Sequence, residues 1–318
     1  MAPVSRSWAY WLQNLAGVGV LAGFAWYLFS RREHFAGVLQ ISRLDVAALV
    51  ALTGVAFLVI SAQSYLLFRA AGVRFSFREN LLLSLATFFG NYLPMRAGTL
   101  TRARYLKVVH GLGYARFGSV FGVRVVLTVV ATGVMGLMGT LGLALTGEHL
   151  SIPLLVLFLA FAVLPASVLV WKAPSPPRQV GRAFRALYDF AEGVAELRRR
   201  PSLSLQVLGL LMVQYAAAGA RFYVAARAIG EDVSPLLVGL LAPVASLANF
   251  TALTPGALGL REAVMGYVTY AAGTSFSAGA YLGTLDRMVL LAVVALTGGP
   301  AFLWVWMRVS HGTQGLER

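Results

Sequence analysis

The sequence contains no cysteine among its 318 residues. This absence excludes disulfide bonds, a thiol nucleophile and any metal site built from thiolates. Histidine is scarce as well, and the four histidines are scattered near the ends of apolar segments. A lone histidine in such a place is usually solvated. We therefore expect no metal ion, no other cofactor and no catalytic histidine.

Charged residues are also scarce. They make up 12% of the chain, whereas a soluble domain carries about 25%. Hydrophobic residues make up 58%, and the mean hydropathy is +0.75. These values predict an all-α, polytopic membrane protein, organised as a single integral-membrane domain over residues 1–318.

Acidic residues are the scarcer of the two charged kinds. The chain has 12 Asp and Glu against 26 Lys and Arg, which gives a formal net charge of +14. Such an excess can indicate nucleic-acid binding. In a membrane protein it has a simpler cause, because Lys and Arg gather in cytoplasmic loops and beside anionic headgroups. We therefore expect membrane lipids, and no nucleic acid, as partners.

Apolar stretches long enough to cross a bilayer, which takes about 20 residues, recur along the chain. We expect about six full spans, at residues 8–29, 46–68, 117–145, 152–171, 203–226 and 277–307. The basic segment 172–201 has apolar residues at helical spacing. This pattern predicts an amphipathic helix on the cytoplasmic surface.

Two further apolar stretches, residues 83–107 and 244–264, are too short to cross and are interrupted. Interrupted backbone survives in lipid only where protein or a water-filled cavity covers it, and in transporters such breaks mark binding sites. We therefore expect two broken, re-entrant helix pairs. The residues that we assign to the breaks are Pro94, Gly98, Pro255, Gly256 and Gly259.

The two broken stretches are separated by three full spans, so they enter the membrane from opposite faces. This inverted internal repeat is typical of transporters. We place the first repeat at about 44–145 and the second at about 203–308. Basic residues in the loops put both termini on the cytoplasmic side.

Charged residues at membrane depth are the candidate site residues. An arginine inside a span costs about 2.5–3.5 kcal/mol on insertion scales, so it faces a cavity or a partner. A helix that restarts after a break also offers free N–H groups to a phosphate or a carboxylate. The residues that we expect to bind a lipid headgroup are Asn91, Arg96, Arg102, Arg124, Arg261, Glu262, Asp286 and Arg287.

The same charges have a structural alternative. Glu262 or Asp286 could pair with an arginine and lock two helices together, and the sequence leaves both possibilities open. No paired-carboxylate dyad, Ser/His/Asp set, P-loop or metal-ligand spacing accompanies these charges. We therefore expect that the protein is not an enzyme.

Two motifs resemble a known family. The first is Asn-x-x-Pro-x-Arg-x-Gly followed by a basic helix, over residues 91–102, and the second is Pro-Gly-x-Leu-Gly-x-Arg-Glu over residues 255–262. Both resemble the lysylphosphatidylglycerol synthetase transmembrane-region family, also called the flippase-like domain family, and the resemblance covers essentially the whole chain. One departure is Thr99, where the family usually has glutamate.

This resemblance implies the handling of polar lipids in the cytoplasmic membrane of a bacterium or an archaeon. Some members carry a fused aminoacyl transferase, which this sequence does not contain, so we expect no aminoacylating activity. We expect the protein to bind a polar or anionic lipid and to translocate it across the inner membrane. Two alternatives stay open. One is a membrane subunit that presents lipid to a separate lipid-modifying enzyme, and the other is an integral-membrane transferase that acts on a lipid-linked substrate.

Overall fold

The computed structural model describes residues 41–92, 97–147, 152–170, 199–231, 233–248 and 259–314, with a few single residues besides (Trp26, Tyr188, Ala191, Glu192 and Ala195). All regular structure in these ranges is helical, which confirms the all-α class. The predicted span at residues 8–29 and most of the predicted amphipathic segment 172–201 lie outside the described residues.

Four of the described helices are long and apolar enough to cross a membrane, namely α3, α6, α9 and α12. Their positions agree with four of the predicted spans to within a few residues, and they confirm a multi-pass helical membrane protein. The helices are α3 (Arg43–Ala70), α4 (Phe77–Gly90), α5 (Ala97–His110), α6 (Tyr114–Leu145), α7 (Ile152–Val170), α9 (Pro201–Ala228), α10 (Pro235–Ala248), α11 (Leu260–Ala271) and α12 (Phe276–Gln314).

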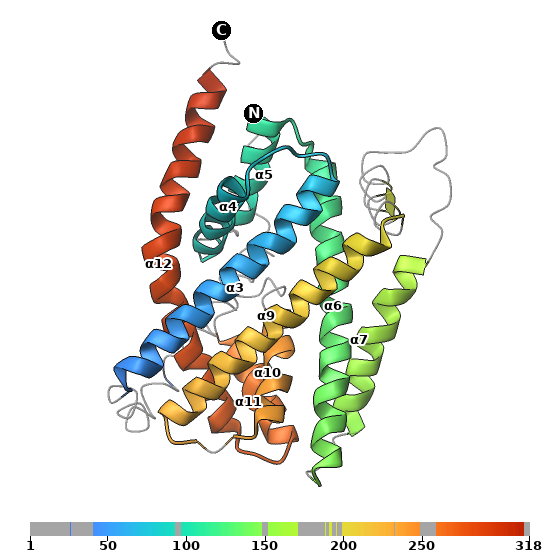
Figure 1. Cartoon of the computed structure of the whole chain (residues 1–318), viewed down its shortest axis with the longest axis vertical. Coiled ribbons are helices and arrows are strands. Elements are labelled where there is room, and N and C mark those ends of the chain that lie inside the picture. Colours follow the sequence, from blue (N-terminus) through green and yellow to red (C-terminus); the bar gives the residue numbers. More distant parts are fainter. Residues whose placement is uncertain are drawn as a thin grey trace.

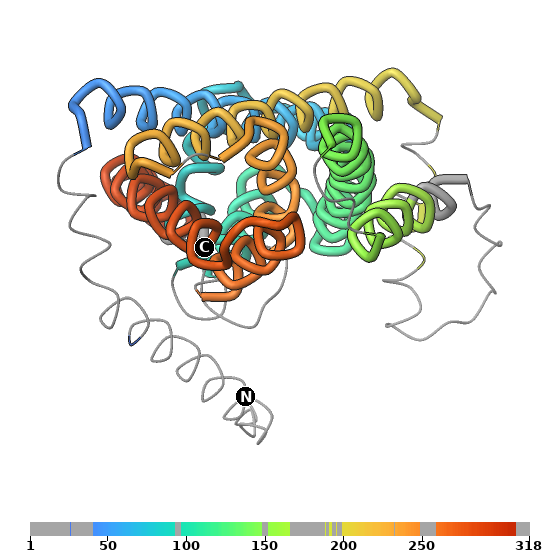
Figure 2. The backbone as a smooth tube through the Cα atoms, turned by 90° about the horizontal axis from the view of Figure 1, so that it is seen from below, coloured from blue at the N-terminus to red at the C-terminus, as the bar shows by residue number. Residues whose placement is uncertain are grey.

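Helices α3 and α9 lie side by side and run antiparallel along one side of the molecule (Figures 1 and 2). Behind this pair, α6 and α7 pack together on one flank and α12 lies on the other (Figure 2). The amide nitrogen of Gln63 on α3 donates a hydrogen bond to the amide oxygen of Gln214 on α9, at 2.9 Å. In apolar surroundings such a bond helps to hold two helices together.

Each of the two broken stretches forms a pair of short helices. The pair α4–α5 lies toward one end of the molecule and α10–α11 toward the other (Figure 1). Helix α4 packs on α12, and α10 packs on α6. The first helix of each broken pair therefore contacts a long helix from the other predicted repeat. Helices α6 and α12 run in opposite directions (Figure 1). An inverted repeat requires this arrangement, and the repeat itself stays a prediction.

The apolar core has two parts. One part lies among α6, α9 and α10 and includes Leu127, Leu211 and Leu240. The other lies among α4, α5 and α12 and includes Leu83 and Leu106. Each broken pair is therefore covered by packed side chains, which is the condition for interrupted helices to exist in lipid.

The two break glycines that the structure describes serve different purposes. Gly98, at the start of α5, lies so close to α4 that a Cβ atom there would collide with the carbonyl oxygen of Thr87. Gly259, just before α11, has a φ of 80°, a left-handed conformation that favours glycine. The other predicted break residues, Pro94, Pro255 and Gly256, lie outside the described residues.

The inverted repeat predicts that the turn before α4 and the turn before α12 face opposite sides of the membrane. Arg74 and Ser275 are exposed in these turns, and the chain has no native cysteine. The single variants Arg74→Cys and Ser275→Cys should therefore react with a membrane-impermeant maleimide from opposite sides of sealed vesicles. Labelling in detergent controls for the accessibility of each thiol. Reaction of both from the same side would contradict the inverted repeat.

Candidate functional site

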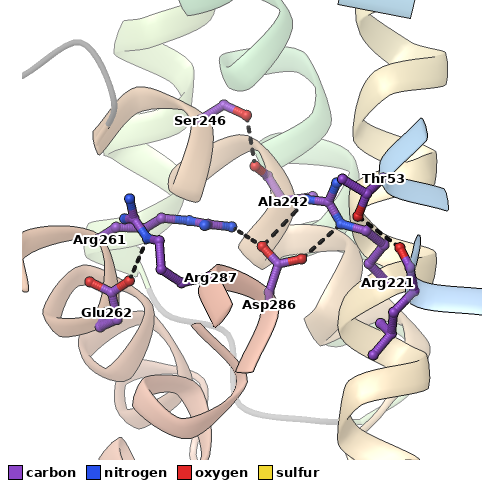
Figure 3. A network of polar contacts seen from close by, with 9 residues as sticks. Thr53, Arg221, Ala242, Ser246, Arg261, Glu262, Asp286 and Arg287 are labelled. Atoms are coloured by element: carbon purple, nitrogen blue, oxygen red, sulfur yellow. Dashed lines mark hydrogen bonds and ion pairs between the residues drawn. The ribbon is translucent and has the colours of Figure 1, made fainter. Parts of the chain in front are cut away.

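Asp286 lies at the centre of a buried cluster of charges in the second half of the chain (Figure 3). Its Oδ1 accepts a hydrogen bond from Nε of Arg221 on α9, at 2.7 Å. Its Oδ2 accepts a hydrogen bond from Nη2 of Arg261 on α11. The carboxylate is 1% exposed. One aspartate on α12 therefore ties together three helices.

Glu262 forms the second part of the cluster and uses both carboxylate oxygens. Oε1 accepts a hydrogen bond from Nε of Arg287 on α12, at 3.1 Å (Figure 3). Oε2 accepts a hydrogen bond from the backbone N–H of Gly259, at 2.9 Å. A carboxylate at the start of a helix satisfies a free N–H group and is favoured by the helix dipole. Glu262 therefore both caps α11 and holds it to α12.

The charges of the second half are thus paired within the protein. Four of the predicted headgroup residues belong to this cluster, and each has an oppositely charged partner: Arg261, Glu262, Asp286 and Arg287. Their pairing matches the structural alternative that the sequence left open. Because both carboxylates are 1% exposed, the ion pairs lie out of contact with solvent. We call this cluster the ion-pair lock.

Arg221 also belongs to the ion-pair lock, although it is not among the site residues predicted from the sequence. It is buried on α9 beside Phe222 and Ala225, and its hydrogen bonds go to the Asp286 carboxylate. The signal in the sequence was an arginine within an apolar span, which is the same signal that selected Arg124 and Arg287. Arg221 was not selected because it lies near the end of its predicted span, at residues 203–226.

A separate cavity of about 220 Å³ lies among α3, α4, α5, α6 and α9, with one residue each from α10 and α12 at its edge. Its apolar wall includes Phe88, Phe117 and Leu211. None of the four predicted site residues that belong to the ion-pair lock lines this cavity. The polar residues that line it are Ser64, Ser84, Thr87, Asn91, Tyr92, Thr99, Arg102, Arg124, Thr128, Gln214 and Ser246.

Arg102 enters this cavity from α5 and has only neutral partners among the described residues. Its Nη2 donates a hydrogen bond to Oδ1 of Asn80, at 2.8 Å, and its guanidinium lies over the ring of Phe68, at 4.8 Å from the centroid. Asn80 is itself fixed, because its amide nitrogen donates to the carbonyl oxygen of Ser61, at 2.7 Å. The buried Nε of Arg102 has no hydrogen-bond partner in the part of the chain that the structure describes.

Arg124 enters the same cavity from α6. Its Nε is also buried and without a hydrogen-bond partner in the described ranges. Among the described residues, no carboxylate forms an ion pair with Arg102 or with Arg124, and no Asp or Glu lines the cavity. Both guanidiniums line the same cavity. Within the described ranges, no carboxylate therefore balances the positive charge at the cavity.

Asn91, another predicted site residue, lines the cavity at the break between α4 and α5. Its Oδ1 accepts hydrogen bonds from the backbone N–H and from the hydroxyl of Thr99, both at 3.0 Å. A neutral amide therefore caps the start of α5, where a carboxylate caps the start of α11. Arg96, the remaining predicted site residue, lies outside the described residues.

Comparison with known proteins adds one finding. A family model described as the lysylphosphatidylglycerol synthase TM region matches residues 14–298. The matched range contains both broken helix pairs, the cavity and the ion-pair lock. No curated protein matches the chain.

The ion-pair lock predicts a specific pattern of stability. Arg287→Gln leaves the Glu262 carboxylate buried without its charged partner, and breaking a buried pair costs about 3–5 kcal/mol. We expect a clear fall in the thermal unfolding temperature in detergent. The double variant Glu262→Gln/Arg287→Gln removes both charges and should recover much of the loss.

Arg227→Gln is a matched control, because Arg227 lies exposed near the end of α9. It should leave the unfolding temperature unchanged, since exposed charges contribute little to stability. A double variant as unstable as Arg287→Gln alone would show that Glu262 and Arg287 do not act as a pair.

Proposed function

Because this chain belongs to the lysylphosphatidylglycerol synthase TM region family, we propose that it binds a membrane lipid with a polar or anionic headgroup and translocates it across the membrane. The observation that carries the proposal is the cavity into which Arg102 and Arg124 project without an acidic partner among the described residues. Uncompensated arginines are costly at membrane depth, and they mark substrate pathways in membrane proteins.

The cavity has the composition that a lipid headgroup requires. Its guanidiniums and amides suit phosphate and glycerol oxygens, and its aromatic and leucine side chains suit the first carbons of an acyl chain. A volume of 220 Å³ corresponds to about seven water molecules, at about 30 Å³ each. We therefore propose that only the headgroup enters the cavity, while the acyl chains stay in the bilayer.

Translocation requires that the headgroup site open toward each face in turn. The two broken pairs lie toward opposite ends of the molecule (Figure 1), so each end has a pair of short helices. In transporters built on inverted repeats, the substrate lies between such broken helices and the repeats rock around it. The arrangement in this chain supports the same mode of movement.

We propose transport without a catalytic step. The buried carboxylates, Glu262 and Asp286, are engaged with Arg287 and with Arg221 and Arg261 respectively. A carboxylate held by arginines is a poor general base, because its negative charge is already stabilised. This favours transport over the lipid-linked transferase that the sequence left open.

The distribution of basic residues supports an orientation in the cytoplasmic membrane. Arg69 ends α3, Lys107 and His110 end α5, and Arg116 lies at the start of α6. These helix ends meet at the upper end of the molecule in Figure 1. Cytoplasmic loops carry an excess of Lys and Arg, so we propose that this end faces the cytoplasm of a bacterium or an archaeon, with both chain termini on the same side.

A reconstituted transport assay tests the proposal. Vesicles containing the protein and a trace of fluorescent phosphatidylglycerol should lose more fluorescence to an external reducing agent than protein-free vesicles, which lose only their outer-leaflet signal. Arg124→Gln should slow this movement about ten- to a hundredfold, which corresponds to the loss of one charged hydrogen bond. Arg227→Gln, outside the cavity, should move lipid at the native rate.

Binding without movement would contradict translocation. A chain that binds phosphatidylglycerol but leaves the inner-leaflet signal untouched would instead fit the alternative of a membrane subunit that presents lipid to a separate enzyme. Adding a candidate lipid-modifying enzyme to the same vesicles would then test that alternative directly.

A further inference from the structure

We propose that the cavity of Arg102 and Arg124 selects headgroups by net negative charge. It takes the phosphate of an anionic lipid and rejects a headgroup whose phosphate is offset by an ammonium group. This inference rests on the proposed lipid-binding function and names the class of lipid that the site accepts.

The charge balance of the two halves is the first observation. In the ion-pair lock, two carboxylates face three guanidiniums and every guanidinium contacts a carboxylate. In the cavity, two guanidiniums face no carboxylate among the described residues. A buried charge without a partner is unfavourable. An anion in the cavity would supply the charge that Glu262 and Asp286 supply in the second half.

The free donors of the cavity are the second observation. Arg102 donates a hydrogen bond from Nη2 to Asn80. Its buried Nε–H has no acceptor in the described ranges. Arg124 likewise presents a buried Nε–H without an acceptor among the described residues. The edge of a guanidinium that contains Nε matches two oxygens of a phosphate. Because both arginines line one cavity, we expect a phosphate there to accept hydrogen bonds from their Nε–H groups.

The lining also argues against a cationic or zwitterionic headgroup. An ammonium group needs a carboxylate or an open aromatic face, and no carboxylate lines the cavity in the described part of the chain. The face of Phe68 is already covered by the guanidinium of Arg102. Four other aromatic residues line the cavity, but the two guanidiniums repel any cation placed beside them. They are Phe88, Tyr92, Phe117 and Phe121. We therefore expect a headgroup esterified with lysine, which adds ammonium groups, to bind more weakly than phosphatidylglycerol.

The asymmetry of the helix caps is the third observation. Glu262 is a carboxylate at the start of α11 and bonds an arginine of α12. At the start of α5, Asn91 and Thr99 form a neutral cap beside the cavity. The start of α11 thus carries a carboxylate, whereas the cap of α5 beside the cavity carries none. This difference supports a headgroup site at the cavity.

A substitution of Thr99 tests the selection by charge most directly, because Thr99 lines the same cavity as the two arginines. Thr99→Glu places a carboxylate there and should compete with a phosphate for Arg102 and Arg124. Thr99→Gln has nearly the same size without the charge and is the matched control. Arg124→Gln is a second variant that removes a donor, and it keeps the test decisive if Thr99→Glu does not fold.

The experiment measures binding of a fluorescent short-chain phosphatidylglycerol to the full-length protein in detergent, by polarisation. Unlabelled phosphatidylglycerol should displace the probe, whereas phosphatidylcholine and lysyl-phosphatidylglycerol should need at least about a tenfold higher concentration, the scale of one charged contact. Thr99→Glu and Arg124→Gln should weaken probe binding about tenfold or more. Thr99→Gln should change it much less.

Competition by phosphatidylcholine or lysyl-phosphatidylglycerol at the same concentration as phosphatidylglycerol would overturn the selection by charge, while lipid binding itself would stand. Equal effects of Thr99→Glu and Thr99→Gln would overturn it as well. Displacement by glycerol 3-phosphate or inorganic phosphate as effective as by the lipid would assign the site to a soluble phosphate. That result, or the absence of any probe binding, would contradict the proposed lipid function instead.

Discussion

A guanidinium buried among apolar helices must meet a compensating charge, and this requirement organises the molecule. In water an arginine can remain unpaired at almost no cost, but at membrane depth it needs a partner or a polar cavity. The chain meets this requirement in two ways. Asp286 and Glu262 provide carboxylates for Arg221, Arg261 and Arg287, while Arg102 and Arg124 share a polar cavity.

The same requirement explains how helices can be broken inside this fold. A helix that restarts exposes backbone N–H groups, which are costly to leave without a partner in lipid. At α11 the Glu262 carboxylate accepts the N–H of Gly259, and at α5 the Asn91 amide accepts the N–H of Thr99. Each cap is also a neighbour of the buried arginines, so the backbone break and the charged site are parts of one local structure.

Much of this architecture follows from local sequence, but the partners of the charges do not. Apolar length predicted the four long helices. Of the predicted break residues, Gly98 lies at the start of α5 and Gly259 lies directly before α11. Pairing depends on helix rotation, because successive helical residues point about 100° apart. Asp286 and Arg287 are neighbours in sequence, yet Asp286 meets Arg221 while Arg287 meets Glu262. No local pattern could indicate these partners, nor the neutral contact of Arg102 with Asn80.

The contrast between the ion-pair lock, where every arginine contacts a carboxylate, and the cavity, where no carboxylate of the described residues pairs with Arg102 or Arg124, bears on the proposed movement of lipid. A ligand shifts a conformational equilibrium only by its differential affinity for the two states. The ion-pair lock supplies its own counter-charges, so a headgroup gains little by approaching it. In the cavity, a bound anion would provide the negative charge that Arg102 and Arg124 do not receive from the described residues. A headgroup in the cavity would therefore contact α4, α5 and α6, whereas Glu262 and Asp286 join α11, α12 and α9 by ion pairs.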